Sequence, residues 1–271
     1  MSEHFLVAHP ELVDFHHKVE DFAVEVNSLI AERFKDRHPN PLSGGAFYSI
    51  SANMLALHRA VLTLCFGGWA FSVPILLRTM FELYLQILVI GKNKKDAEYM
   101  AFLCNYWFLK HNINDPTFSN EAKQQFRKQI EDGLNRLDEE TRKKAKHFIF
   151  KERMRRFWYS PEYSGPTDVL EKFGRSDLQF IYTHYSSASH GGLLGLNMLK
   201  DQPDSIHPNP RADKRSQNMA LVSSSRLTLE ASFARAQLES YNVSDAYQAL
   251  LSELLGLKKA VDGGENLISV R

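Results

Sequence analysis

Hydrophobic positions recur at steps of three and four residues along almost the whole chain, which is the period of an amphipathic helix. The stretch 10–36 shows this spacing, and "HPNPLSGG" follows as a proline- and glycine-rich breaker. The same pattern predicts further helices over 48–66, 73–90, 97–112, 120–136, 138–157, 168–174, 177–190, 217–241 and 244–261. No run of residues demands a β-strand. We therefore expect an all-α multi-helix bundle.

The pattern also suggests how the helices are started and grouped. We expect Asp96, Ser119, Thr167 and Ser176 to cap the helices that follow them, and Pro74 to lie in a first helical turn. One helical domain should span 1–271. Its parts are an N-terminal amphipathic helix in 1–40, a core bundle in 45–195 and a C-terminal helical pair in 217–261.

Two of the expected helices, 48–66 and 73–90, are apolar and should form the centre of the bundle. The stretch "AVLTLCFGGWAFSVPILL", residues 60–77, covers the end of the first helix and the start of the second, and it has 18 residues without a charge. A membrane-spanning helix needs about 20 predominantly apolar residues. Gly67, Gly68 and Pro74 interrupt this run, so we expect two buried helices joined by a tight turn and no membrane partner.

Composition adds few constraints. The charged residues make up 24% of the chain and the formal net charge is +1, so no overall field recruits nucleic acid or membrane. Cys65 and Cys104 stand in apolar stretches, as reduced buried thiols do. The first 15 residues show no basic region followed by an apolar run, so we expect a cytoplasmic protein.

A polar stripe runs along the apolar helix expected over 73–90. Arg78, Glu82 and Gln86 are spaced i, i+4, i+8 and share one face. A helix this apolar should be buried, and charges inside it must be paired because desolvation is costly. Either an internal Arg–Glu pair fixes the helix register, or these groups line a binding or catalytic cleft.

A second polar stripe ends the helix expected over 177–190. Tyr182, Ser186, Ser189 and His190 follow one another at helical spacing, and Gly191 then stops or kinks the helix. The negative end of the helix dipole favours imidazolium, so His190 is a candidate general acid–base that Tyr182 or Ser186 orients. Alternatively, the small serines only let a neighbouring helix approach closely.

The other histidines look structural. His58 lies within an apolar helix and is expected to be a satisfied core residue, whereas His16 and His17 should lie on a surface face. No metal-ligand spacing and no phosphate-binding glycine loop is present, so we expect neither a metal nor another cofactor.

The stripes resemble a bacterial helical family, domain of unknown function 5677. Its pattern is an Arg-x-x-x-Glu helix followed by a Tyr-x-x-x-Ser-x-x-x-His helix, which Arg78, Glu82, Tyr182, Ser186 and His190 match within 45–195. The chain is more weakly similar to HEPN ribonucleases, metal-independent helical RNases that often work as dimers. In their motif an arginine precedes the histidine by four to six residues. Tyr185 stands at that place here, so Arg78 would supply the cation from another helix.

A basic segment covers 141–156, with eight Lys or Arg against one Glu, and Trp158 and Tyr159 follow it. Such a face suits a phosphate backbone with stacked bases. The candidate nucleic-acid contacts are Lys143, Lys144, Lys146, Lys151, Arg155 and Arg156. The alternative is a solvated helix face that the acidic stretch "EDGLNRLDEE" neutralises.

These features support three hypotheses. In the first, the protein is a HEPN-like RNase effector of phage defence or of a toxin–antitoxin pair, without a cofactor. His190 acts on a ribose 2′-hydroxyl, Arg78 stabilises the phosphorane, and Glu82, Tyr182 and Ser186 hold them in place. RNA and a second copy or larger complex are the expected partners. In the second, the protein is a binding or scaffold subunit whose polar cluster is structural. In the third, it senses a nucleotide or small molecule.

Overall fold

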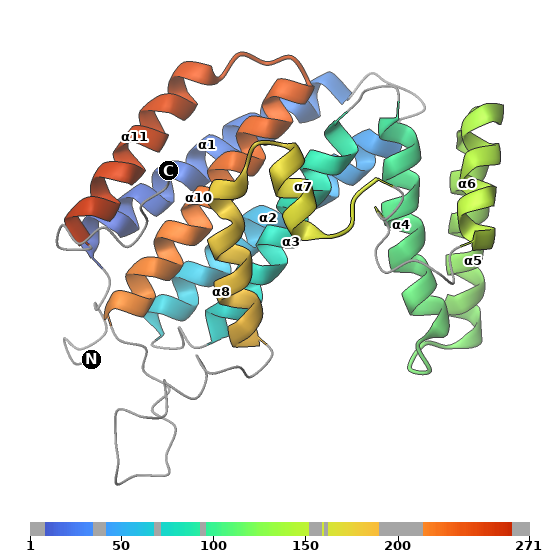
Figure 1. The fold of residues 1–271 in the computed structure, drawn as a ribbon, viewed down its shortest axis with the longest axis horizontal. Helices are drawn as coiled ribbons and strands as arrows, with labels where there is room; N and C mark the ends of the chain where they lie inside the picture. The colour runs from blue at the N-terminus through green and yellow to red at the C-terminus, as the bar shows by residue number, and fades with distance from the viewer. Residues whose placement is uncertain are drawn as a thin grey trace, which may run out of the picture. The chain divides into compact units, whose positions relative to one another are not determined.

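The computed structural model describes residues 9–34, 42–67, 72–92, 96–151, 159, 162–189 and 214–261. All regular structure in these residues is helical (Figure 1), which confirms the predicted all-α fold. The helices are α1 (Pro10–Phe34), α2 (Leu42–Phe66), α3 (Val73–Gly91), α4 (Ala97–Asn114), α5 (Asn120–Arg136), α6 (Glu139–Lys151), α7 (Pro166–Lys172), the 3₁₀ turn η4 (Ser176–Leu178), α8 (Gln179–Ser189), α10 (Lys214–Leu238) and α11 (Ser244–Val261).

The chain divides into two compact units. Unit 1 comprises Met1–Glu32, Ser51–Tyr84 and Arg175–Arg271, and unit 2 comprises Arg33–Ile50 and Leu85–Gly174. The helices α2 and α3 therefore contribute residues to both units. The single domain over 1–271 stays a prediction.

In unit 1, α10 carries an unusual number of buried polar side chains for a core helix. Its buried residues include Ser223, Ser224, Ser225, Thr228 and Glu230. A buried polar group must find a hydrogen-bond partner, and the partners here come from other helices. Stacked rings of Phe233 and Tyr247, 3.8 Å between centroids, join α10 to α11.

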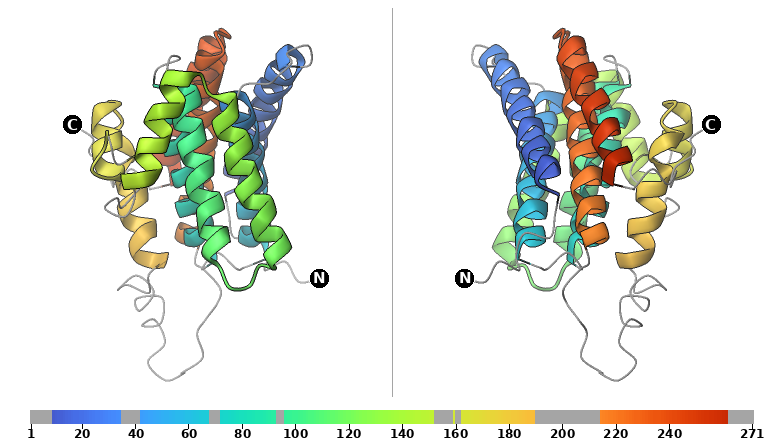
Figure 2. Two further views of the ribbon diagram at one scale, coloured as in Figure 1. Left: turned by 90° about the vertical axis from the view of Figure 1, so that its right-hand side faces the viewer. Right: turned by 90° about the vertical axis from the view of Figure 1, so that its left-hand side faces the viewer.

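In unit 2, α4, α5 and α6 lie side by side (Figure 2). A Cβ at Gly133 of α5 would lie only 3.2 Å from the Phe102 ring of α4, so glycine permits this close approach. The Arg142 guanidinium donates to the carbonyls of Leu134 (2.9 Å), Asn135 (3.1 Å) and Leu137 (2.9 Å) at the end of α5. A cation at this position also complements the helix dipole.

The start of α2 differs from the prediction, because α2 begins at Leu42 and includes Gly44 and Gly45. The Glu98 carboxylate accepts hydrogen bonds from the backbone N–H groups of Leu42 (2.7 Å) and Ser43 (3.1 Å), and from the Ser43 hydroxyl. These are donors that a helix N-terminus leaves without intrahelical partners. A cap from 55 residues along the chain thus starts the helix where the local sequence predicted a breaker.

Of the four predicted caps, only that of Ser119 has the expected bond. Its hydroxyl accepts from the backbone N–H of Ala122 at 3.2 Å. Asp96 occupies the N-cap position of α4 without a side-chain cap bond. Pro166, rather than the residue after Thr167, begins α7, and Ser176 starts one 3₁₀ turn before α8.

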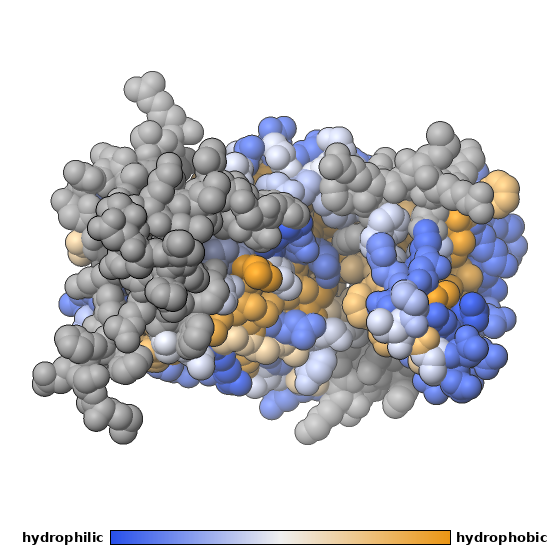
Figure 3. Space-filling model, turned by 90° about the horizontal axis from the view of Figure 1, so that it is seen from below, coloured by the Kyte–Doolittle hydropathy of each residue, from blue (hydrophilic) through white to orange (hydrophobic). Residues whose placement is uncertain are grey.

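Two of the described helices are long and apolar enough to cross a membrane by length and composition alone, α2 and α3. In the most apolar window of each, 33% and 56% of the residues are buried inside the protein. Core helices of soluble proteins pass the same test, so this is weak evidence. Figure 3 shows one face on which apolar areas lie among hydrophilic residues. The cytoplasmic location and the lack of a membrane partner stay predictions.

Candidate functional site on α3 and α8

The Arg78–Glu82 pair forms on α3, but it is not buried. The Arg78 Nε lies 3.1 Å from the Glu82 Oε1, and the two side chains are 28% and 50% exposed. The sequence predicted a buried site because α3 is apolar on nearly all sides, and it left open whether the pair is internal or lines a cleft. The structure corrects this prediction: the stripe lies on the side of α3 that solvent reaches.

The helix α8 contacts α3 through Tyr182, the first residue of the predicted hydroxyl stripe. The Tyr182 ring, partly buried, is 5.3 Å from the Phe81 ring of α3, measured between centroids. Phe81 directly precedes Glu82 and follows Arg78 by three residues. Ser186 lies one turn after Tyr182 in α8, and His190 lies outside the described residues. The structure therefore brings the helices of both predicted stripes together through a ring contact.

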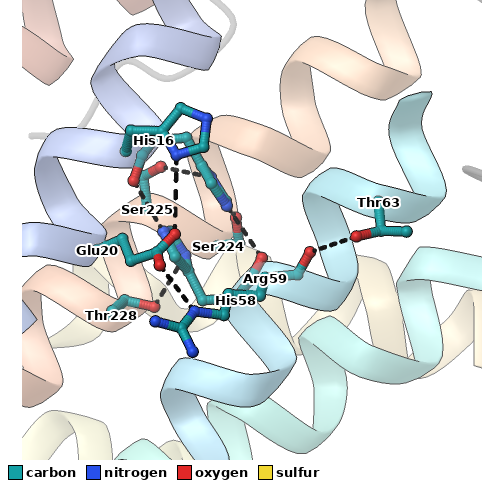
Figure 4. A network of polar contacts seen from close by, with 9 residues as sticks. His16, Glu20, His58, Arg59, Thr63, Ser224, Ser225 and Thr228 are labelled. Atoms are coloured by element: carbon teal, nitrogen blue, oxygen red, sulfur yellow. Dashed lines mark hydrogen bonds and ion pairs between the residues drawn. The ribbon is translucent and has the colours of Figure 1, made fainter. Parts of the chain in front are cut away.

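A second polar cluster, which the sequence analysis missed, lies in the core between α1, α2 and α10 (Figure 4). The rings of His16 and His58 stack with centroids 3.4 Å apart and planes 8° apart, and both side chains are fully buried. Each Nε2–H donates to the backbone carbonyl of the other histidine, at 2.9 Å and 3.0 Å. The prediction that His16 lies on the surface is wrong, and His58 is the core residue that was expected.

The partners of these rings determine their protonation. Because both Nε2 atoms donate to carbonyls, each Nδ1 must accept: His16 from the Ser225 hydroxyl and His58 from that of Thr228, both at 3.2 Å. Burial lowers the pKa of His16 to about 2, helped by the neighbouring His58, and lowers the pKa of His58 to about 4. Both imidazoles are thus neutral and fully engaged, which suits helix packing and leaves no nitrogen for chemistry.

A third cluster, also missed, surrounds Glu230 of α10, which is 1% exposed. Its carboxylate contacts the Arg175 Nη1 at 2.5 Å, the Arg226 Nε at 2.8 Å and the Tyr247 hydroxyl at 2.9 Å. Asp177 pairs with both arginines, so two cations face two anions. Burial raises the pKa of Tyr247 to about 12, so its hydroxyl stays protonated and donates to Glu230. The Arg175 Nη1 also donates to the Tyr84 hydroxyl of α3 at 2.9 Å, so this balanced network joins α3, η4, α10 and α11.

The basic segment is only partly described. Lys143 pairs with Glu139 at 2.8 Å, and Lys144 with Glu140 at 2.9 Å, all on the exposed side of α6. Lys146 is exposed as well. Lys151 ends α6, and Arg155 and Arg156 lie outside the described residues. The acidic residues that compensate this face come from the first turn of α6 itself.

Metal binding has no support in the part of the chain that the structure describes, where no three His, Cys, Asp or Glu side chains cluster as ligands would. Both cysteines there are free, and burial raises the pKa of each thiol to about 12, which keeps them protonated. A protonated thiol is neither a nucleophile nor a metal ligand.

These features define an all-helical protein with a solvent-accessible Arg–Glu pair on α3 beside the hydroxyl-bearing helix α8. The sequence matches the model of a family of unknown function, DUF5677, over residues 46–206, which is more than half of the chain. The chain belongs to this family, as its Arg-x-x-x-Glu and Tyr-x-x-x-Ser-x-x-x-His stripes predicted. No curated protein and no solved structure matches it. The similarity to HEPN ribonucleases stays a prediction.

Proposed function

We propose that the α3–α8 face is a metal-independent site for cleavage of RNA. The observation that supports this is the exposure of the Arg78–Glu82 pair. A buried pair would serve helix packing, whereas an accessible guanidinium held by a carboxylate can meet a phosphate from solvent. The Glu230 carboxylate and the stacked histidines of unit 1 are buried and engaged internally, so the α3–α8 face is the better candidate for chemistry.

In the proposed reaction, His190 removes the proton of a ribose 2′-hydroxyl, and the 2′-oxygen attacks the adjacent phosphorus. The bond from phosphorus to the 5′-oxygen breaks, and that oxygen takes up a proton from the protonated His190 or from water. The products carry a 2′,3′-cyclic phosphate and a 5′-hydroxyl. Arg78 stabilises the extra negative charge of the phosphorane, and Glu82 orients Arg78. Tyr182 and Ser186 hold the imidazole in place.

The test is cleavage of end-labelled single-stranded RNA by the purified chain in EDTA, with the product ends identified. We expect cyclic-phosphate ends, and a loss of rate of about 10²-fold or more in His190→Ala, the range for a general acid–base. The matched control is His17→Ala, which removes an exposed histidine from α1. Cleavage that needs a metal ion, or that persists in His190→Ala, would contradict the proposal.

The biological setting we propose is an effector of phage defence or of a toxin–antitoxin pair in a bacterial cytoplasm, acting as a homodimer or within a larger complex. The similarity to HEPN ribonucleases supports this setting. Growth arrest on expression of the wild-type chain, and none with His190→Ala, is the expected result. Equal growth of the two strains would contradict the setting.

A second candidate is a binding subunit without catalytic activity, or a sensor of a nucleotide. A large exposed aromatic side chain in unit 2, Phe150, favours a partner surface of this kind. A nucleotide that binds only the folded state would raise the melting temperature. RNA that is bound but left intact in the cleavage assay would favour this candidate over the RNase.

A further inference from the structure

The solvent face of α6 in unit 2 carries a stripe of cationic and aromatic side chains. Lys143, Lys146, His147 and Phe150 stand at i, i+3, i+4 and i+7, and all four are exposed. The opposite side of the helix is buried through Ala145 and Phe148. The spacing puts the four side chains next to one another on one face. We call these four residues the α6 strip.

Phe150 is the most exposed large hydrophobic residue in the described part of the chain, with 86% of its surface in solvent. A single exposed hydrophobic residue is ordinary on a protein surface. Phe150 is distinctive because Lys143, Lys146 and His147 precede it on the same face of α6. The next most exposed, Phe108 on α4 at 64%, has Ala101, Cys104 and Asn105 at the corresponding positions.

Lys146 has fewer acidic neighbours in the sequence than Lys143. Lys143 contacts Glu139, but this pair is exposed and such pairs contribute little, so a phosphate can replace the carboxylate. No acidic residue stands three or four positions from Lys146 on either side in the sequence. The strip therefore places an exposed aromatic ring one helical turn after Lys146 and two turns after Lys143.

We propose that the α6 strip binds single-stranded RNA, with a base stacked on the Phe150 ring and the backbone phosphates against Lys143 and Lys146. Stacking on aromatic side chains and contact with cations are how proteins hold unpaired strands. A duplex keeps its bases stacked on one another, so it cannot use the ring. A membrane-surface helix would place several apolar residues on this face, whereas the strip has one among three basic side chains.

The proposal extends the proposed function, because it rests on RNA being the substrate class and adds where the strand is held. It is tested with the full chain and a fluorescent 2′-O-methyl RNA of about 12 nucleotides, within the usual site size. This RNA has no 2′-hydroxyl, so it binds without being cleaved. Binding is followed by fluorescence anisotropy at several salt concentrations.

We expect Phe150→Ala to weaken binding about tenfold, as loss of one base stack does, and Phe108→Ala to leave it unchanged. Lys143→Ala together with Lys146→Ala should flatten the dependence of affinity on salt, because fewer counterions are released. All three variants change exposed side chains, so each should fold as the wild type does.

Equal losses of RNA affinity in Phe150→Ala and Phe108→Ala would overturn the proposal for the α6 strip. Equal affinity of the wild type for single-stranded and duplex RNA would overturn it as well. Binding to vesicles of anionic lipid that depends on Phe150 would overturn it in favour of a membrane surface. The cleavage assay separates the two proposals. If the wild type binds RNA through the α6 strip but does not cleave it, only the proposed function is contradicted. If the protein cleaves RNA and Phe150→Ala binds it with wild-type affinity, only the proposal for the α6 strip is contradicted.

Discussion

Burial separates the charged residues of unit 1 into two kinds. Glu230 is 1% exposed and meets two arginines and a tyrosine hydroxyl, whereas Glu82 is half exposed and meets Arg78 on its own helix. Removing a buried partner leaves a charge without compensation, and removing an exposed one leaves a charge that water solvates. The buried charged residues should therefore contribute to stability, whereas the exposed ones are available for chemistry.

Glu230→Gln tests this division, because it keeps the shape of the side chain and removes its charge. We expect the free energy of unfolding to fall by about 3 kcal/mol, since Arg175 and Arg226 lose a buried counter-ion. Glu82→Gln is the matched control and should cost less than about 1 kcal/mol. Urea unfolding of both variants measures the difference, and equal costs would contradict the division.

The stacked pair of His16 and His58 predicts how stability depends on pH. The unfolded chain takes up protons on these residues near pH 6.5, whereas burial holds their folded pKa values at about 2 and about 4. The unfolded state thus binds more protons below pH 6.5, and stability falls as the pH drops. Each histidine should contribute a loss of about 1.4 kcal/mol per pH unit between these limits.

The readout is the slope of unfolding free energy against pH from urea titrations between about pH 4.5 and 6.5. A His16→Gln/His58→Gln variant should be less stable at neutral pH but show a flatter slope. Residues that face the pair, His17 and the Glu20–Arg59 ion pair, remain in this variant. His17→Ala should keep the wild-type slope. An unchanged slope in the double variant would show that these histidines do not titrate as their burial requires.

At the scale of elements, the hydrophobic period was enough to predict most helices. It failed at the start of α2, where the cap comes from Glu98 on α4, and a local pattern cannot show a distant partner. His16 could have been found, because it follows Phe15 and lies four residues after Leu12 on the apolar face of α1.

The candidate site was predictable only in part, for a related reason. The i, i+4 spacing predicted the Arg78–Glu82 pair, but in a helix that is apolar on nearly all sides the period cannot show which face meets solvent. The Glu230 network could not be predicted from the sequence. Arg175 forms hydrogen bonds with Glu230, 55 positions away, and with Tyr84, 91 positions away. Packing of distant segments, not local pattern, creates that cluster.

The cap on α2 yields a prediction at this scale. Glu98→Ala removes the acceptor for the backbone N–H groups of Leu42 and Ser43, so we expect the free energy of unfolding to fall by about 1–2 kcal/mol. Hydrogen exchange should rise in the first turn of α2. The control is Glu25→Ala, an exposed position in α1. Unchanged protection of the first turn would show that Gly44 and Gly45 are helical without the cap.

At the scale of the whole molecule, the two proposals assign different tasks to different parts of the chain. We propose that the α3–α8 face of unit 1 cleaves RNA and that the α6 strip of unit 2 binds single-stranded RNA. Neither task uses the buried networks around Glu230 and the stacked histidines, which stabilise the helices of unit 1. Variants in these networks should therefore reduce activity only as far as they unfold the protein.

The most direct measurement of the central claim is RNA cleavage in EDTA by Arg78→Ala beside Arg59→Ala. Both changes remove an arginine of unit 1 from a pair with a glutamate, and urea unfolding of each variant checks that both stay folded. The account predicts that Arg78→Ala loses cleavage by about 10²-fold or more while Arg59→Ala retains it. Equal rates in the two variants would show that the α3–α8 face is not the site of cleavage.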